Sequence, residues 1–193
     1  MKLIVREIFY SLQGEGGRQG EASIFIRLSK CNLKCTFCDT DFDNGYEMYI
    51  ADILEHIKQY PCKWIIWTGG EPTIQLTDEI LVNFRNAGYK QAIETNGTRN
   101  VPSLIDYITC SPKINYYKVK EKIPFVQEIR LAIKSGDQIP DISIFPKADN
   151  YFISPIFDGE KPNMRNINYC VEFIKKNPVW KLSLQIHKLI NIE

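Results

Sequence analysis

The sequence lacks an excess of charge of either sign. Its 193 residues include 24 Lys and Arg against 23 Asp and Glu, which leaves a net charge of +1. Proteins that bind nucleic acids usually carry a marked basic excess, because neutralising phosphates supplies most of their non-specific affinity. The balanced charge therefore argues against a nucleic-acid partner.

The sequence also lacks a long hydrophobic run. No apolar stretch approaches the roughly 20 residues of a membrane-spanning helix, and the opening segment MKLIVREIFY is unlike a signal peptide. We find no internal repeat, low-complexity tract or linker. Hydrophobic residues make up 44% of the chain, which is enough for a sizeable core, so we expect one ordinary soluble domain over residues 1–193. We also expect the protein to be cytoplasmic and to have no membrane partner.

Histidine is scarce as well. The chain has two histidines, His56 and His187, and neither lies at zinc-site spacing from a cysteine. We interpret the six cysteines as reduced thiols and metal ligands, not as a disulfide framework. Three of them, Cys62, Cys110 and Cys170, are expected to be ordinary core or surface thiols.

The other three cysteines lie together in the segment CNLKCTFCDT, where Cys31, Cys35 and Cys38 have C-x3-C-x2-C spacing. Three thiolates this close can bind one face of an iron–sulfur cube, whereas clusters normally take four cysteine ligands. The next cysteine, Cys62, follows a predicted helix, so one iron would keep an open position at which chemistry can occur. An aromatic ring at Phe37 fits further, because it can cover the cluster or a bound adenine.

Two other interpretations of this motif stay open, a zinc knot and a set of buried structural cysteines. Zinc sites usually combine paired C-x2-C halves or mix cysteine with histidine. Three cysteines within eight residues are also an unusual way to fill a core. The spacing therefore favours an iron–sulfur cluster in the loop of residues 31–38.

The cysteine triplet, with an aromatic residue before its last cysteine, resembles the signature of the radical S-adenosylmethionine (radical SAM) superfamily. The longer string SLQGEGGRQGEASIFIRLSKCNLKCTFCDT is similar to one branch, the 7-carboxy-7-deazaguanine synthases of queuosine and deazapurine biosynthesis. The similarity continues through TGGEP, ETNGT, SPK and LSLQIHK, so it spans nearly the whole chain. The pair SLQGEG and CDT discriminates this branch better than the triplet does.

Apolar, β-rich runs alternate with helical patterns along the chain, which predicts parallel β/α units and an α/β fold. The resemblance implies a partial (β/α)6-like barrel of the radical SAM type. In such folds ligands gather at the carboxyl ends of the strands, where most of the motifs fall. Strands are predicted at residues 24–28, 64–67, 91–94, 107–109, 126–132, 151–153 and 181–185, and helices at 50–59, 78–87 and 166–176.

The resemblance implies three cofactors, a [4Fe–4S] cluster on Cys31, Cys35 and Cys38, S-adenosylmethionine, and Mg²⁺ on Thr40. The oxygen-rich segment around Thr40 suits Mg²⁺, although the sequence alone favours a helix cap or a solvated turn there. Glycines after a strand expose backbone to a ligand, whereas a Gly-Gly pair or an SPK tripeptide alone is uninformative. By resemblance, the residues that contact S-adenosylmethionine are Phe37, Cys38, Asp39, Gly70, Ser111, Pro112 and Lys113.

The same resemblance assigns the substrate, 6-carboxy-5,6,7,8-tetrahydropterin, to Leu12, Gln13, Gly14, Arg27 and Thr68. A guanidinium group matches a carboxylate through two parallel hydrogen bonds, and this substrate carries a carboxylate. Taken in isolation, SLQGEGG is a flexible polar loop, and Arg27 is a surface arginine on a strand.

Some segments depart from the family pattern or are ambiguous. Ser154 stands where relatives often have glutamine, which puts a cofactor contact in doubt. His187, in a Gln-x-His-Lys motif, either packs with a hydrogen bond or titrates near neutral pH. The role of the terminal Glu193 cannot be placed, and we expect residues 114–124 to be a charged, solvated connector.

The implied activity is that of a lyase, in which a 5′-deoxyadenosyl radical converts the pterin to 7-carboxy-7-deazaguanine with loss of ammonia. The resemblance also implies a homodimer and an external electron donor such as flavodoxin or ferredoxin. The sequence shows no classical acid–base pair. The alternatives are an activase of glycyl-radical enzymes, a non-enzymatic iron–sulfur electron carrier and a zinc-bound binding module.

Overall fold

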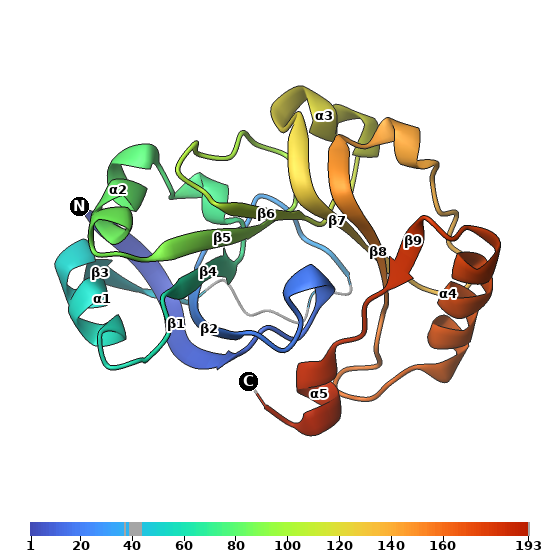
Figure 1. Ribbon diagram of the computed structural model, residues 1–193, viewed down its shortest axis with the longest axis horizontal. Coiled ribbons are helices and arrows are strands. Elements are labelled where there is room, and N and C mark those ends of the chain that lie inside the picture. The colour runs from blue at the N-terminus through green and yellow to red at the C-terminus, as the bar shows by residue number, and fades with distance from the viewer. Residues whose placement is uncertain (37, 39–43, 193) are drawn as a thin grey trace. The chain divides into compact units, whose positions relative to one another are not determined.

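The computed structural model describes residues 1–36, 38 and 44–192, and the chain forms two compact units (Figure 1). The first unit contains Met1–Ser11, Ala22–Thr95 and Asn100–Ile108. The second contains Leu12–Glu21, Asn96–Arg99 and the chain from Thr109 onward. No helix in the described ranges is long and apolar enough to cross a membrane.

In the first unit the strands follow the hydrogen-bonding order β3-β1-β2-β4-β5. The pairs β2–β4 and β4–β5 are parallel, whereas β3 runs antiparallel to β1. The elements are β1 (Lys2–Leu12, whose last residue belongs to the second unit), β2 (Ala22–Leu28), β3 (Tyr46–Tyr49), α1 (Ile50–Ile57), β4 (Trp64–Gly69), α2 (Asp78–Asn86) and β5 (Lys90–Thr95).

One hydrophobic core holds this unit together. Ile26 and Trp67 from the central strands are fully buried with Ile53 from α1 and Phe84 from α2. The Trp67 and Phe84 rings meet edge to face, with centroids 4.9 Å apart. Because β2 and β4 are anchored in this core and run parallel, their carboxyl ends lie side by side.

In the second unit the order is β6-β7-β8-β9, and neighbouring strands are parallel. Helix α4 contacts β8 and β9 (Figure 1). The core of the unit includes Ile129, Ile153, Cys170 and Trp180. The elements are β6 (Tyr107–Cys110, which begins in the first unit), α3 (Val119–Lys122), β7 (Phe125–Ile133), β8 (Lys147–Pro155), α4 (Met164–Lys176), β9 (Trp180–Leu182) and α5 (Ile186–Ile190).

The α/β class and most predicted elements are confirmed, with differences at both ends of the chain. Strand β1 was not predicted, although Leu3 and Val5 are buried in strand alternation. The strand predicted at residues 181–185 ends at Leu182. It ends early because the residues that follow turn toward Gly14 and Gly16. Ser183 Oγ accepts a hydrogen bond from the Gly16 N–H, and the Ile186 N–H donates to the Gly14 carbonyl.

The connector at residues 114–124 is another difference. It was expected to be solvated, but it contains a 3₁₀ turn and the short helix α3. Val119 and Ile123, four residues apart, are buried at 2% and 3% exposure. This i, i+4 apolar pair was hidden among the charges of the segment. That the units together make a single domain over residues 1–193 stays a prediction.

Candidate active site

The cysteine loop follows β2 in the first unit. Lys30 takes a positive φ of 74° and turns the chain from the strand into the loop. Cys31 and Cys35 are partly buried, whereas Cys38 is exposed. The Cys31 sulfur accepts the Leu33 N–H at 3.4 Å, and Cys38 N–H donates to the Cys35 carbonyl at 3.2 Å. The loop therefore presents thiols directly after the carboxyl end of a parallel strand.

These three thiols fit an iron–sulfur cluster as a donor set, because soft thiolates are the ligands that such clusters take. Burial raises the pKa of the Cys31 thiol, and the charges of Glu71, Cys35 and Cys38 raise it further, against the opposing Leu33 N–H. Cys35 and Cys38 thus lie close enough to Cys31 for their charges to act on its thiol. In the described part of the chain no three His, Cys, Asp or Glu side chains converge to hold a metal ion, so the cluster ligands stay predictions.

The TGGEP turn at the end of β4 contacts the residues at which the cysteine loop begins. Gly70 N–H bonds to the Leu28 carbonyl and Glu71 N–H to the Lys30 carbonyl, each at 2.9 Å. A Cβ on Gly70 would lie 2.0 Å from the Lys30 carbonyl oxygen. Only glycine allows this approach, so Gly70, predicted to contact S-adenosylmethionine, is held beside the cysteine loop.

Gly70→Ala is expected to push the turn away from the cysteine loop. We expect a loss of about 1–3 kcal/mol of unfolding free energy, typical of overpacking, together with weakened S-adenosylmethionine binding. Urea unfolding and calorimetric titration of the cluster-loaded protein measure these two effects.

Gly88→Ala is the matched control for Gly70→Ala. Gly88 has a positive φ of 83° and open space around it, so alanine there costs about 1 kcal/mol of strain. We expect this variant to keep full cofactor affinity. Equal affinities of the two variants would remove the cofactor role from the Gly70 turn.

Glu71 fixes the same turn from inside the core. Its side chain is fully buried, and one carboxylate oxygen accepts hydrogen bonds from Thr73 N–H at 3.1 Å, Thr73 Oγ1 at 2.6 Å and Thr95 Oγ1 at 2.8 Å. These bonds connect the turn after β4 to the end of β5. The positions of the backbone groups at Gly70 are therefore set by a side chain that needs no contact with a ligand.

Arg27 and Thr68, both predicted to contact the substrate, lie on neighbouring strands. They are register partners on the parallel pair β2–β4, so their side chains lie on one face of the sheet. Arg27 is not a bare surface arginine, because its Nε donates to the Glu7 carboxylate at 2.7 Å and its guanidinium lies over the Phe9 ring. The sequence did not point to Glu7, since its partner lies on another strand.

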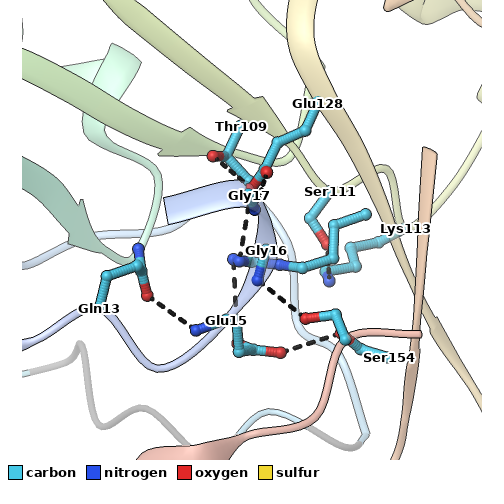
Figure 2. Close-up of polar contacts among 11 residues, drawn as sticks. Gln13, Glu15, Gly16, Gly17, Thr109, Ser111, Lys113, Glu128 and Ser154 are labelled. Atoms are coloured by element: carbon cyan, nitrogen blue, oxygen red, sulfur yellow. Dashed lines mark hydrogen bonds and ion pairs between the residues drawn. The ribbon is translucent and has the colours of Figure 1, made fainter. Parts of the chain in front are cut away.

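In the second unit the segment Leu12–Gly14 opens an ordered turn, so its interpretation as a flexible polar loop is wrong. Gln13 is buried, and its backbone pairs with Glu21 and Gly20 through two hydrogen bonds of 2.8 Å. Its side-chain oxygen accepts the Glu15 N–H at 3.2 Å (Figure 2). The structure thus holds the predicted substrate segment in one conformation.

The C-terminal motif packs on this segment. Ile186 N–H bonds to the Gly14 carbonyl at 3.0 Å, and a Cβ on Gly14 would lie 2.0 Å from His187 Nδ1. His187 is therefore a packed histidine against Gly14. The glycine at this position is required by the close approach of the imidazole.

The SPK tripeptide follows β6, as predicted. Pro112 is buried, and Lys113 Nζ donates to Ser111 Oγ at 2.7 Å (Figure 2). The divergent Ser154 donates its hydroxyl to Glu15 Oε1 at 3.0 Å. The serine that replaces the usual glutamine thus contacts the SLQGEG segment.

Three predicted site residues lie outside the described residues. They are Phe37 and Asp39, assigned to S-adenosylmethionine, and Thr40, assigned to Mg²⁺. The terminal Glu193, for which no role was predicted, lies outside them as well.

The remaining cysteines behave as expected. All six are free thiols, and Cys110 and Cys170 are buried in the second unit. Burial, with a smaller effect of the Asp137 charge, raises the pKa of Cys170 to about 12. Such a thiol carries almost no thiolate at neutral pH and is chemically inert.

We therefore expect anaerobic iodoacetamide treatment of the cluster-free native protein to modify Cys38 and to spare Cys110 and Cys170. Peptide mass spectrometry of the time course measures the three rates. Denatured protein, in which all six thiols react, is the control. Modification of Cys170 at the rate of Cys38 would contradict the burial that the structure shows.

Comparison with known proteins agrees with this arrangement. The sequence model of the Radical SAM superfamily matches residues 25–119, which contain the cysteine loop and the TGGEP turn. The 7-carboxy-7-deazaguanine synthase of Haemophilus influenzae is 44% identical over 197 residues, covering 97% of this chain and 92% of the relative. That of Bacteroides thetaiotaomicron is 40% identical over 188 residues, covering 97% of both chains.

Structural comparison supports the same fold. The crystal structure of QueE from Escherichia coli matches with a TM-score of 0.74 over 96% of this chain and 94% of that chain, at 24% identity. The predicted α/β fold of the radical SAM type is therefore confirmed. Together with the two full-length relatives, these matches show that the chain belongs to the 7-carboxy-7-deazaguanine synthase family of the radical SAM superfamily.

Proposed function

We propose that this protein converts 6-carboxy-5,6,7,8-tetrahydropterin to 7-carboxy-7-deazaguanine with release of ammonia. This carbon–nitrogen lyase step belongs to the 7-deazapurine pathway that leads to queuosine in tRNA. The observation that carries the proposal is the juxtaposition at the ends of β2 and β4. There the cysteine loop, the Gly70 turn and the pair Arg27–Thr68 come from two neighbouring strands.

Each group has a proposed role. Cys31, Cys35 and Cys38 hold the [4Fe–4S] cluster, and Gly70 presents backbone to S-adenosylmethionine. When bound, these groups supply the radical that removes a hydrogen atom from the substrate. The protein contributes ligation, orientation and exclusion of water, which is the usual division of work in cofactor enzymes.

Substrate and further cofactor contacts complete the proposal. Arg27 binds the substrate carboxylate, and Thr68 and Leu12–Gly14 position the pterin. Ser111–Lys113 contact S-adenosylmethionine, and Thr40 holds a Mg²⁺ ion. We also propose a homodimer that receives electrons from a flavodoxin or ferredoxin. Six free thiols support a reducing, cytoplasmic setting.

Anaerobic turnover tests this function. The reconstituted protein receives dithionite, S-adenosylmethionine, Mg²⁺ and 6-carboxytetrahydropterin, and mass spectrometry follows the products. We expect 7-carboxy-7-deazaguanine and ammonia in equal amounts, and neither of them when S-adenosylmethionine is omitted.

The other outcomes separate the alternatives. Formation of 5′-deoxyadenosine without the deazaguanine would keep radical chemistry and require another substrate. Reduction of the cluster with no cleavage of S-adenosylmethionine would favour an electron carrier. Purification with zinc and no iron would favour a zinc-bound module.

A further inference from the structure

Two opposite charges are buried side by side on β7 in the second unit. Glu128 and Arg130 are two residues apart, so both side chains lie on the same face of the strand. They are 2% and 4% exposed, and Arg130 NH1 lies 3.7 Å from Glu128 Oε1. Burying such charges is costly unless partners compensate them. The partners therefore show what the pair does.

The Glu128 carboxylate binds the backbone of the segment Leu12–Glu21 directly. Its Oε2 accepts the Gly17 N–H at 2.7 Å, and its Oε1 accepts the Thr109 hydroxyl at 2.9 Å (Figure 2). Gly16 has a positive φ of 72°, and a Cβ there would lie 2.3 Å from Glu128 Oε1. The absence of a side chain at Gly16 thus lets the chain close on this carboxylate.

The rest of the turn is fixed by the same group of residues. Arg130 NH2 lies 3.9 Å from the Glu15 carboxylate, and Ser154 also donates to that carboxylate. Ser183 Oγ accepts the Gly16 N–H at 2.9 Å. Among these residues, Glu128 is the carboxylate that accepts a hydrogen bond from the backbone of the turn. Hydrogen bonds to an ionised acceptor are about twice as strong as those between neutral groups.

Stability alone does not explain the pair. Replacing a buried ion pair with apolar residues of similar size is often neutral or stabilising, because the desolvation cost disappears. What apolar residues cannot replace is the acceptor for the Gly17 N–H. The contacts of Glu128 thus serve the conformation of one turn.

We propose that Glu128 is a positioning residue that fixes the Gly16–Gly17 turn and thereby orients the substrate segment Leu12–Gly14. The inference rests on the substrate role of that segment in the proposed function. Glu128 itself touches no substrate. It acts through the backbone that follows Gln13 and Gly14.

The test compares two replacements of the charge. In Glu128→Gln the amide oxygen still accepts the Gly17 N–H, and the Thr109 hydroxyl rotates to accept from the amide nitrogen. In the double variant Glu128→Leu with Arg130→Met both members of the pair leave together. Glu15, which Arg130 also approaches, keeps the hydrogen bond from Ser154. The first variant keeps the acceptor, and the second removes it while keeping the volume.

Hydrogen–deuterium exchange of the unloaded protein is the first readout. In the double variant we expect amides of residues 12–21 to exchange at least about tenfold faster, with β8 unchanged. Glu128→Gln keeps the acceptor but loses the charge, so its exchange at residues 12–21 should lie much closer to the wild type than to the double variant. Asn166→Ala is the matched control, because Asn166 is a buried polar residue of the same unit that bonds Ser135 N–H and the Ile156 carbonyl, away from this turn.

Steady-state kinetics is the second readout. We expect the double variant to raise KM for the pterin about tenfold, with little change in kcat, and Glu128→Gln to stay close to the wild-type KM. The proposal is overturned if the exchange rates of residues 12–21 are unchanged in the double variant. It is also overturned if the exchange rates rise equally throughout the unit, as they would in a generally destabilised Asn166→Ala protein. If the wild type makes no deazaguanine, the proposed function fails, and the exchange data still decide whether Glu128 fixes the turn.

Discussion

Cys35→Ala protein is expected to emerge colourless from anaerobic reconstitution and to leave S-adenosylmethionine intact. The loop supplies three thiols, and a cube already held by three ligands does not survive the loss of one. Cys35 lies between the other two proposed ligands in the sequence, and its carbonyl accepts the Cys38 N–H. Iron content, visible absorbance and 5′-deoxyadenosine formation measure the loss, which should be complete for all three.

Cys62→Ser is the control for Cys35→Ala. Cys62 lies in the same unit, is also partly buried, and its thiol donates to the Ala22 carbonyl at 2.9 Å, a bond that serine can retain. We expect this variant to bind iron and cleave S-adenosylmethionine like the wild type. Loss of the cluster in Cys62→Ser would reveal a fourth protein ligand and favour an electron carrier. Cleavage by Cys35→Ala would falsify the ligand assignment.

The sequence predicted those parts of the site that depend on local chain geometry. Three cysteines within one loop carry their own signal in their spacing. The Gly69–Gly70 turn was also predictable, because a parallel strand ends there and glycine permits the backbone contact with Lys30. In the same way, β2 and β4 are dense runs of β-branched and aromatic residues that can only be buried strands.

The residues that were missed act across the chain. Glu7 pairs with Arg27 from another strand, and Ser183 meets Gly16 from the far end of the sequence. Such partners are chosen by tertiary packing, which no local pattern records. Glu128 and Arg130 did leave a signal, because two charges at alternate positions of a mostly apolar strand are costly unless they have buried partners.

Strand β1 shows the same limit at the level of secondary structure. Its alternation of buried and exposed positions is interrupted by Arg6 and Glu7, and it runs into the SLQ of the substrate segment. In the sequence alone, the SLQ end of this strand resembles the start of a polar loop. Strand β1 forms because it hydrogen-bonds to β2 and, over residues 2–5, to β3. The β3 partners lie more than thirty positions away in the sequence.

Arg27→Ala is expected to weaken pterin binding by about 2–4 kcal/mol, the usual cost of truncating one partner of a buried charge pair. That corresponds to roughly a 30- to 800-fold rise in Kd or KM. S-adenosylmethionine binding should not change, because Arg27 is assigned to the substrate carboxylate. Calorimetric titration with the pterin, and product formation at varied pterin concentration, measure the effect.

Arg27→Lys separates charge from geometry. Lysine keeps the positive charge but lacks the planar fork that binds a carboxylate by two parallel hydrogen bonds. We expect it to recover only part of the lost affinity. Equal affinities for wild type and both variants would return Arg27 to the role of a surface strand arginine.

Glu7→Gln tests the role of Arg27 by removing the carboxylate with which Arg27 pairs in the ligand-free chain. In the ligand-free chain Glu7 offers its carboxylate to Arg27, as the substrate does in the proposed complex. Since Glu7 is half exposed, releasing this pair is worth about 0.2–1 kcal/mol. If Glu7 competes with the substrate, the variant binds the pterin up to severalfold more tightly. If Glu7 instead holds Arg27 in place over Phe9, the variant binds it more weakly. A changed affinity in Glu7→Gln together with the loss in Arg27→Ala supports the Arg27 guanidinium as the group that receives the substrate carboxylate. An unchanged affinity in all three variants excludes that role.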